Sequence, residues 1–326
     1  MKRSQGFFIL SYTAQYYIKL IRRTALNNQS ENQGIFDWNT WGLAIRLRTL
    51  PASAAGVVTG SALAWHDGFF RFDAALACLC TALLLQIGSN LANDVFDFER
   101  GTDTPERLGP VRVTQAGLLT PSQVKFGMYL AFALAAFFGL YLAWLGGWPI
   151  LIVGLAAILS AIAYTGGPFP LGYHGLGDLF VFIFFGLASV AGTYYVQAES
   201  VSAAAWWMAI PPGLIITAIL VVNNLRDLEN DRTAGKHTVA VILGERASKI
   251  QFLICILVAY LVMAIAILLG IVPGTSLLTW LSLPLAVKTT RIVFTQKGRP
   301  LNGALAGTGQ LALLFSLLFW VSLFFK

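Results

Sequence analysis

The sequence predicts an all-α membrane protein, folded as a bundle of about nine transmembrane helices. Of its 326 residues, 57% are hydrophobic and only 11% are charged, and the mean hydropathy is +0.70. A soluble domain carries roughly 25% charged residues, so this chain has the composition of a lipid-solvated protein. Long apolar runs recur along it, and no segment sustains the alternation of a strand. Backbone groups in lipid must be hydrogen-bonded within their own segment, which favours helices.

The apolar runs define the individual spans. Crossing the hydrocarbon layer takes about 20 predominantly apolar residues. The predicted spans are Thr49–Trp65, Ala74–Asn93, Val124–Trp144, Trp148–Tyr164, Leu179–Gln197, Ala205–Val222, Ile250–Leu269, Val272–Val293 and Gly303–Phe325.

The basic residues are distributed unequally between the connections. If the N-terminus is cytoplasmic, all of the 22 Lys and Arg residues except Arg71 and Lys326 fall on the cytoplasmic side. Such a bias sets the orientation of membrane proteins and supports the count of nine spans. We therefore predict a multi-pass protein of the inner (cytoplasmic) membrane with a cytoplasmic N-terminus. The net charge of +7 then belongs to a membrane face, so the expected partner is the lipid bilayer and not nucleic acid.

Ahead of the first span lies a leader, and we divide the chain into this leader (1–41) and a transmembrane domain (42–326). Phe7, Leu10, Ala14, Tyr17 and Ile21 fall near helical spacing. This pattern is typical of an interfacial helix on the cytoplasmic leaflet, followed by a polar linker over residues 27–34. No small-residue cleavage site follows a compact apolar core, so a signal peptide is disfavoured.

Two clusters of acidic and amide residues stand at the cytoplasmic ends of predicted spans. In the first, Asn90, Asn93, Asp94 and Asp97 lie three or four residues apart, and Asp103 follows after a glycine. This spacing places the four on one face of a helix.

The second cluster follows the sixth predicted span and repeats the pattern. Asn223, Asp227 and Asp231 are each four residues apart. Carboxylates at membrane depth are costly and usually mark a functional site. Because both clusters are on the same side of the membrane, they can face each other across a bundle. The alternative is that they are juxtamembrane charges paired with neighbouring Arg.

Clustered hard oxygen ligands predict Mg²⁺ as the cofactor. Mg²⁺ typically binds one or two carboxylates together with substrate phosphates. Flanking Arg and Lys side chains would bind the remaining phosphate charge. The two clusters therefore predict a site for a diphosphate on the cytoplasmic side.

The two clusters resemble the motifs of the UbiA superfamily of intramembrane aromatic prenyltransferases. Residues 93–97 (NDVFD) match the start of its NDxxDxxxD motif, and Asp227 and Asp231 match its DxxxD motif. Gly101 replaces the last acid of the first motif, and Asp103 follows two residues later. This departure is similar to the branch that prenylates 1,4-dihydroxy-2-naphthoate for menaquinone synthesis. Segments that resemble that branch are 46–51 (RLRTLP), 107–117 (RLGPVRVTQAG), 164–178 (YTGGPFPLGYHGLGD) and 235–244 (GKHTVAVILG).

The resemblance, which covers residues 46 to about 325, implies two Mg²⁺ ions that bridge a polyprenyl diphosphate to both clusters. It implies the metal ligands Asn90, Asp94, Asp97, Asp227, Asp231 and Asp103. The cations expected at the diphosphate are Lys236, Arg112 and Arg226, with Arg46 and Arg48 behind them. Tyr164 is expected either to face the allylic cation, since a cation gains ~0.5–2 kcal/mol over an aromatic ring, or to be an interfacial tyrosine.

The implied reaction is transfer of a polyprenyl group to an aromatic acceptor, 1,4-dihydroxy-2-naphthoate, with loss of its carboxyl group. The alternative acceptor within the superfamily is 4-hydroxybenzoate. An alternative of another class is an ion-coupled transporter. A carrier would place its acids near the bilayer midplane within an inverted repeat, whereas these acids lie at helix ends and no repeat is evident.

Overall fold

A computed structural model describes residues 37–103 and 108–325, and in these residues all regular structure is helical. The chain divides into two compact units, residues 1–42 and 43–326, of which the second is the helical bundle. The prediction of an interfacial leader helix falls outside the described residues. The all-α fold class is confirmed.

The bundle is built from α-helices joined by short 3₁₀ and π segments. In chain order the elements are α2 (Trp38–Ile45), η1 (Leu47–Thr49), α3 (Leu50–His66), α4 (Phe72–Glu99), α5 (Pro121–Gly146), α6 (Trp148–Ala163), η2 (Leu171–His174), α7 (Gly177–Val181), the π-helical η3 (Phe182–Ala188), α8 (Ser189–Ala198), α9 (Ala203–Arg226), α10 (Leu228–Thr233), α11 (Val239–Leu268), η4 (Gly274–Ser282), α12 (Leu283–Thr295) and α13 (Leu301–Ser322).

The spanning segments follow the predicted ones. In the described part of the chain, seven helical segments are long and apolar enough to cross a membrane: α4, α5, Gly177–Ala198, α9, α11, Gly274–Thr295 and α13. The other two predicted spans coincide with the shorter helices α3 and α6, which have 17 and 16 residues. At 1.5 Å per residue such a helix reaches roughly 25 Å, slightly less than the hydrocarbon thickness. The chain is thus an integral multi-pass membrane protein, for which nine spans is an approximate count.

Local sequence signals explain where the long helices begin. Thr120 accepts a hydrogen bond from the backbone of Gln123, and the Gln123 side chain accepts one from the backbone of Thr120. This capping box precedes α5, whose first residue is Pro121. Ser202 and Thr238 cap α9 and α11 in the same way with their hydroxyl oxygens.

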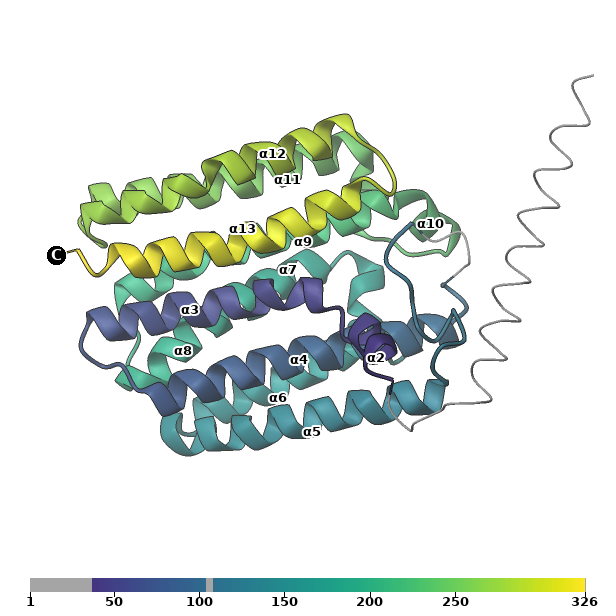
Figure 1. Cartoon of the computed structure of the whole chain (residues 1–326), viewed down its shortest axis with the longest axis horizontal. Helices are drawn as coiled ribbons and strands as arrows, with labels where there is room; N and C mark the ends of the chain where they lie inside the picture. The colour runs from purple at the N-terminus through teal and green to yellow at the C-terminus, as the bar shows by residue number, and fades with distance from the viewer. Residues whose placement is uncertain (1–36, 104–107, 326) are drawn as a thin grey trace, which may run out of the picture. The chain divides into compact units, whose positions relative to one another are not determined.

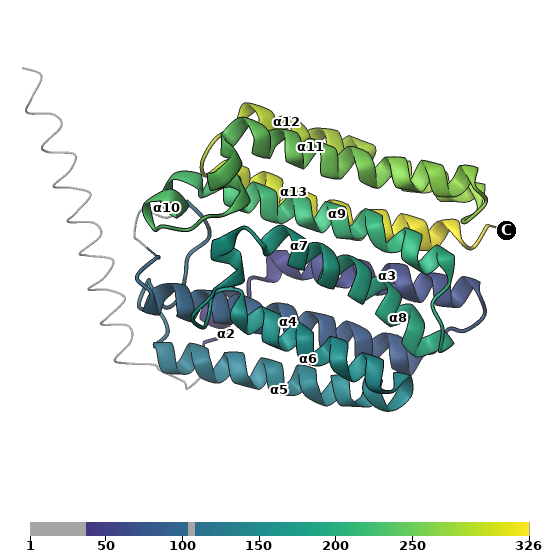
Figure 2. The same cartoon turned by 180° about the vertical axis from the view of Figure 1, so that it is seen from behind.

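Helix α9 forms the centre of the bundle and packs against α11, α13 and η3 (Figures 1 and 2). Small residues allow the close contacts. A Cβ added to Gly186 of η3 would lie 2.8 Å from Cα of Gly213 in α9. Likewise, a Cβ on Gly60 of α3 would lie 2.5 Å from the backbone oxygen of Val190 in α8. In lipid, where hydrophobic burial does not drive helix association, such close packing does.

Both acidic segments lie at one end of the bundle. Figure 1 shows that α4 and α9, with α3 between them in this view, both end on the side of the bundle where α10 lies, and Figure 2 shows the same end from behind. Described residues of three connections meet there, because Asp97 of α4 bonds to Arg112, Tyr173 and Lys236. This common end carries the candidate site.

Candidate functional site

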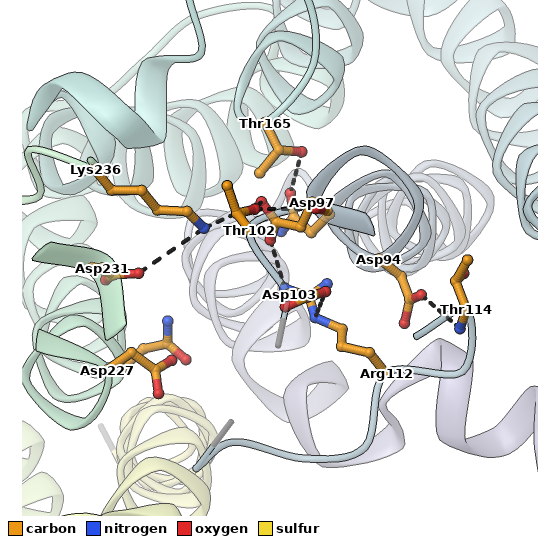
Figure 3. A network of polar contacts seen from close by, with 12 residues as sticks. Asp94, Asp97, Thr102, Asp103, Arg112, Thr114, Thr165, Asp227, Asp231 and Lys236 are labelled. Carbon is orange, nitrogen blue, oxygen red and sulfur yellow. Dashed lines mark hydrogen bonds and ion pairs between the residues drawn. The ribbon is translucent and has the colours of Figure 1, made fainter. Parts of the chain in front are cut away.

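The two acidic clusters are joined by a lysine from a third segment. Lys236, which follows α10, places its Nζ 3.2 Å from Oδ1 of Asp97 on α4 and 4.0 Å from Oδ1 of Asp231 on α10. Figure 3 shows this side chain between the two carboxylates. The two clusters therefore lie on either side of Lys236, in the facing arrangement that the sequence predicted.

Asp97 is the most heavily bonded of the acids. Its Oδ2 accepts a hydrogen bond from Nη2 of Arg112 at 2.9 Å. Its Oδ1 accepts bonds from the Tyr173 hydroxyl at 2.5 Å and from Lys236. The carboxylate side chain is only 3% exposed. Charge-assisted bonds of this kind compensate the desolvation of a buried carboxylate.

Arg112 is a fully enclosed cation in the connection after α4. Its Nε lies 3.3 Å from Oδ2 of Asp103. Burial opposes its charge, but Asp97, Asp103, Asp94 and Asp227 outweigh that effect and raise the pKa of Arg112. Its Nη1 is buried and has no hydrogen-bond partner in the described residues. An unsatisfied buried donor is costly, so this atom is available to an anionic ligand.

Asp94 has a different set of partners, although it lies one turn before Asp97 on α4. Its two carboxylate oxygens accept hydrogen bonds from the backbone N–H groups of Val113 and Thr114, at 3.1 and 3.0 Å. The side chain is buried at 1% exposure. Asp94 thus holds the loop that carries Arg112 against α4. The role of Asp94 as a metal ligand stays a prediction.

Asn90 likewise connects segments of the bundle. Its amide nitrogen donates to the backbone oxygen of Ile45 and to Oγ1 of Thr49, and its oxygen accepts a bond from Gln86. These contacts link α4 to the segment that leads into α3. Asn90 therefore bonds α4 to Ile45 and Thr49, a contact that the spacing did not predict. Its role as a metal ligand stays a prediction.

In the second cluster, Arg226 is enclosed by acceptors. Its guanidinium donates to both carboxylate oxygens of Asp227, to Oδ1 of Asn223 and to Oδ1 of Asn302 on α13. The Arg226 side chain is fully buried. Arg226 thus braces the end of α9 against α13 and orients Asp227, whereas the sequence suggested only a cation at the diphosphate.

Tyr173 is a site residue that the sequence did not predict. Its hydroxyl bonds to Asp97 and lies 3.1 Å from Oγ1 of Thr102, and Nζ of Lys236 lies 4.5 Å from its ring centre. Burial first, and then the neighbouring Asp97, raise the pKa of Tyr173, so the phenol stays protonated and donates. A tyrosine in a glycine-rich connection has no periodic pattern that would distinguish it.

Tyr164 packs beneath the same connection. A Cβ on Gly172 would lie 2.8 Å from the Tyr164 ring, and a Cβ on Gly177 would lie 2.8 Å from its hydroxyl. The two glycines therefore leave the space that this ring occupies. Its predicted contact with an allylic cation stays a prediction.

The remaining predicted cations differ in their exposure. Arg46, which has a left-handed backbone (φ 57°), is half-buried, whereas Arg48 is exposed. The described residues give Arg48 no ion pair with an acidic side chain. The partners of Asp97 described above are Arg112, Tyr173 and Lys236, and the roles of Arg46 and Arg48 at the diphosphate stay predictions.

The donor set fits Mg²⁺ bound together with a diphosphate. In the described part of the chain, carboxylates and cations gather at this end of the bundle: Asp94, Asp97, Asp103, Asp227 and Asp231 with Arg112, Arg226 and Lys236. No three His, Cys, Asp or Glu side chains of the described residues converge on one metal position. Mg²⁺ needs only one or two carboxylates when phosphate oxygens supply other ligands.

Residues 53–300 match the sequence profile of the UbiA prenyltransferase family. The chain is 39% identical over 305 residues to 1,4-dihydroxy-2-naphthoate octaprenyltransferase of Escherichia coli (strain K12), covering 90% of this chain and 97% of that protein. It is 37% identical over 295 residues to the protein of the same name from Haemophilus influenzae, covering 87% and 95%.

Solved structures share the fold. The bundle matches the apo structure of a UbiA homolog from Aeropyrum pernix K1 with a TM-score of 0.65 and 15% identity, over 86% of this chain and 98% of that one. It also matches a UbiA homolog from Archaeoglobus fulgidus bound to GPP and Mg²⁺, with a TM-score of 0.61 and 15% identity, over 87% and 99%.

Proposed function

Because the chain belongs to the UbiA prenyltransferase family, we propose that it transfers a polyprenyl group from a polyprenyl diphosphate to 1,4-dihydroxy-2-naphthoate in menaquinone biosynthesis. The acceptor follows from the relatives, which carry that substrate in their names and are aligned over nearly their whole length. The chain is an integral membrane enzyme of the prenyltransferase class.

The observation that carries the proposal is the position of Lys236. It connects Asp97 of the first cluster with Asp231 of the second, and Arg112 adds a second buried cation beside Asp97. Acidic and basic groups in this arrangement suit a diphosphate with its counter-ions. Mg²⁺, when bound, would neutralise the negative charge that develops on the departing diphosphate; Asp97, Asp103, Asp227 and Asp231 would hold it.

The residues of the chain prepare the bond cleavage. Arg112 and Lys236 direct N–H donors at the position where the diphosphate would lie, and their charge stabilises it as the C–O bond breaks. The diphosphate leaves with the electron pair of that bond, and a ring carbon of the acceptor forms the new C–C bond. The acceptor then loses its carboxyl group as CO₂.

Neither alternative from the sequence is favoured by these findings. The two named relatives above are naphthoate enzymes, which supports the naphthoate over 4-hydroxybenzoate. A transporter would need its acids at the midplane, whereas Asp97 and Asp231 lie at the ends of helices. We further propose that this end faces the cytoplasm, from the excess of Lys and Arg in its connections.

The test is a transfer assay on the purified chain with Mg²⁺ and a polyprenyl diphosphate. We expect prenylation of 1,4-dihydroxy-2-naphthoate with release of diphosphate and CO₂, and its loss when EDTA removes the metal. Parallel reactions contain 4-hydroxybenzoate instead. Turnover of the benzoate alone would contradict the proposed acceptor, and transfer undiminished by EDTA would contradict the Mg²⁺ dependence.

A further inference from the structure

A cavity lies at the same end of the bundle, beside α10. It has a volume of about 370 Å³ and is bounded by the end of α9, by α10, by the start of α11 and by the connection between α12 and α13. Asp231 of α10 contributes to the acidic site, whereas Glu229 and Arg232 of the same helix line this cavity. Helix α10 therefore contributes residues to both the acidic network and this cavity, and Arg226, which is bonded to Asp227, also lines the cavity.

The cavity contains more positive than negative charge. Glu245 makes ion pairs with both Lys249, at 2.8 Å, and Lys297, at 2.7 Å. Arg232 pairs with Glu229 at 3.0 Å. One carboxylate thus serves two ammonium groups, and the Lys249 side chain is only 14% exposed. A buried ammonium that shares its counter-charge favours a further anion.

Exposed apolar side chains lie beside Lys249, which lines the cavity. Nζ of Lys249 donates to the backbone oxygen of Phe294, whose side chain is 42% exposed near the end of α12. Ile250, next to Lys249, is 45% exposed on the apolar helix α11. Cations at helix ends beside exposed apolar residues are the arrangement that binds anionic lipid headgroups.

We propose that this cavity binds the phosphate group of an anionic phospholipid. The phosphate would replace Glu245 as the ion-pair partner of Lys249 and Lys297. The shared chemistry is a phosphate oxyanion, for which the two sources are a lipid headgroup and free inorganic phosphate. The position beside Phe294 and Ile250 favours the lipid, since its acyl chains can lie against these side chains. The inference is independent of the reaction proposed above.

The test is native mass spectrometry of the full chain in detergent, titrated with dioleoyl-phosphatidylglycerol or dioleoyl-phosphatidylcholine. We expect selective retention of the phosphatidylglycerol. The double variant Lys249→Gln/Lys297→Gln should bind it roughly fivefold more weakly for each lysine removed, because a lysine near an anionic headgroup contributes about that factor. The matched control, Lys288→Gln/Arg291→Gln, removes two exposed cations of α12 outside the cavity and should bind as the unmodified chain does.

A variant of opposite sign separates binding from misfolding. Glu245→Gln removes the internal competitor and should strengthen retention by a similar factor. Equal retention of both lipids, or retention unaffected by the lysine and glutamate variants, would overturn the proposal. A parallel titration with inorganic phosphate distinguishes the two sources. If phosphate displaces the phosphatidylglycerol, the headgroup and the free ion share one binding position, as proposed. If phosphate binds and the lipid stays bound, the two occupy different positions, and the lipid headgroup is not in this cavity.

Discussion

Asp94 and Asp97 lie one turn apart on α4, and both are buried, but their partners differ in kind. Asp94 accepts bonds from two backbone N–H groups, whereas Asp97 is surrounded by the side chains of Arg112, Tyr173 and Lys236. Backbone partners fix a loop in place. Side-chain partners can move to a substrate. One acidic motif thus contains a residue that holds a loop in place and a residue of the proposed diphosphate site, and each of the following predictions tests that division.

The largest expected effect is a loss of activity, from a substitution among the acids that contact side chains and not backbone groups. Asp231→Asn should lower the rate of prenyl transfer by about 10²–10³-fold, the range found when one stabilising group of an active site is removed. Asparagine has nearly the shape of aspartate, and Asp231 is already 4.0 Å from Lys236, so the melting temperature should change little. Rates and thermal melts of the purified variant check both.

The control for Asp231→Asn is Glu229→Gln on the same helix. Glu229 is 77% exposed and pairs only with Arg232, so transfer should be unaffected. Equal losses from both substitutions would show that α10 tolerates no charge change, and would remove Asp231 from the site.

The next effect is a loss of stability, from substitution of Asp94, which holds the loop in place. Asp94→Asn removes one of the two acceptors of the backbone N–H groups of Val113 and Thr114, and should reduce the free energy of unfolding by about 2 kcal/mol. Asp73→Asn on the same helix is the comparison, because Asp73 is half-exposed and its ion pair with Arg71 contributes under about 1 kcal/mol. If Asp73→Asn is the more destabilising in thermal melts, the scaffold role of Asp94 is wrong.

A smaller effect on the rate of prenyl transfer is expected at Tyr173, which contacts Asp97. Tyr173→Phe deletes the hydroxyl bonded to Asp97 but retains the ring beneath Lys236. A hydrogen bond to a charged group contributes about 1.5–3 kcal/mol, so transfer should slow by at least about tenfold. An unchanged rate would mean that Asp97 needs no donor from this connection.

The smallest effect is expected at Arg48. Its side chain is exposed, and an exposed charge contributes at most about 1 kcal/mol to an ion pair. Arg48→Gln should therefore weaken diphosphate binding by less than about fivefold, as measured by titration. A greater loss would place Arg48 against the diphosphate and extend the site beyond the network around Asp97.

The fold was predictable because the membrane imposes a length on each span. Runs of about 20 apolar residues identified even the π-helical segment η3 as part of a span, although nothing in its composition indicates the π geometry. Spacing correctly placed Asn90, Asn93, Asp94 and Asp97 on one helix, α4. The prediction of a single helical face for the second cluster was wrong, because α9 ends at Arg226, Asp227 has a non-helical backbone and Asp231 lies in the separate helix α10. Helical periodicity, however, cannot assign the partners of Asp94 and Asn90, which lie in loops and neighbouring segments.

The contacts between distant segments were not predictable in detail. Lys236 and Asp97 are separated by 139 residues, and their contact depends on how the segment after α10 is placed beside the end of α4. Tyr173 had no pattern to single it out, and Arg226 was expected at the diphosphate whereas the structure encloses it among Asp227, Asn223 and Asn302. Residue type and spacing report on one helix at a time, and these roles depend on three or more.

The central claim is that the acids of α4 and α10 form one Mg²⁺-dependent diphosphate site. The direct measurement is calorimetric binding of an unreactive prenyl thiodiphosphate, with and without Mg²⁺, to the unmodified chain, to Asp97→Asn, to Asp231→Asn and to the double variant. Each single substitution should abolish most of the Mg²⁺-dependent affinity, and the double variant should bind no more weakly than the weaker single one, because residues of one site are coupled. Additive losses, or binding that does not require Mg²⁺, would contradict a single shared site.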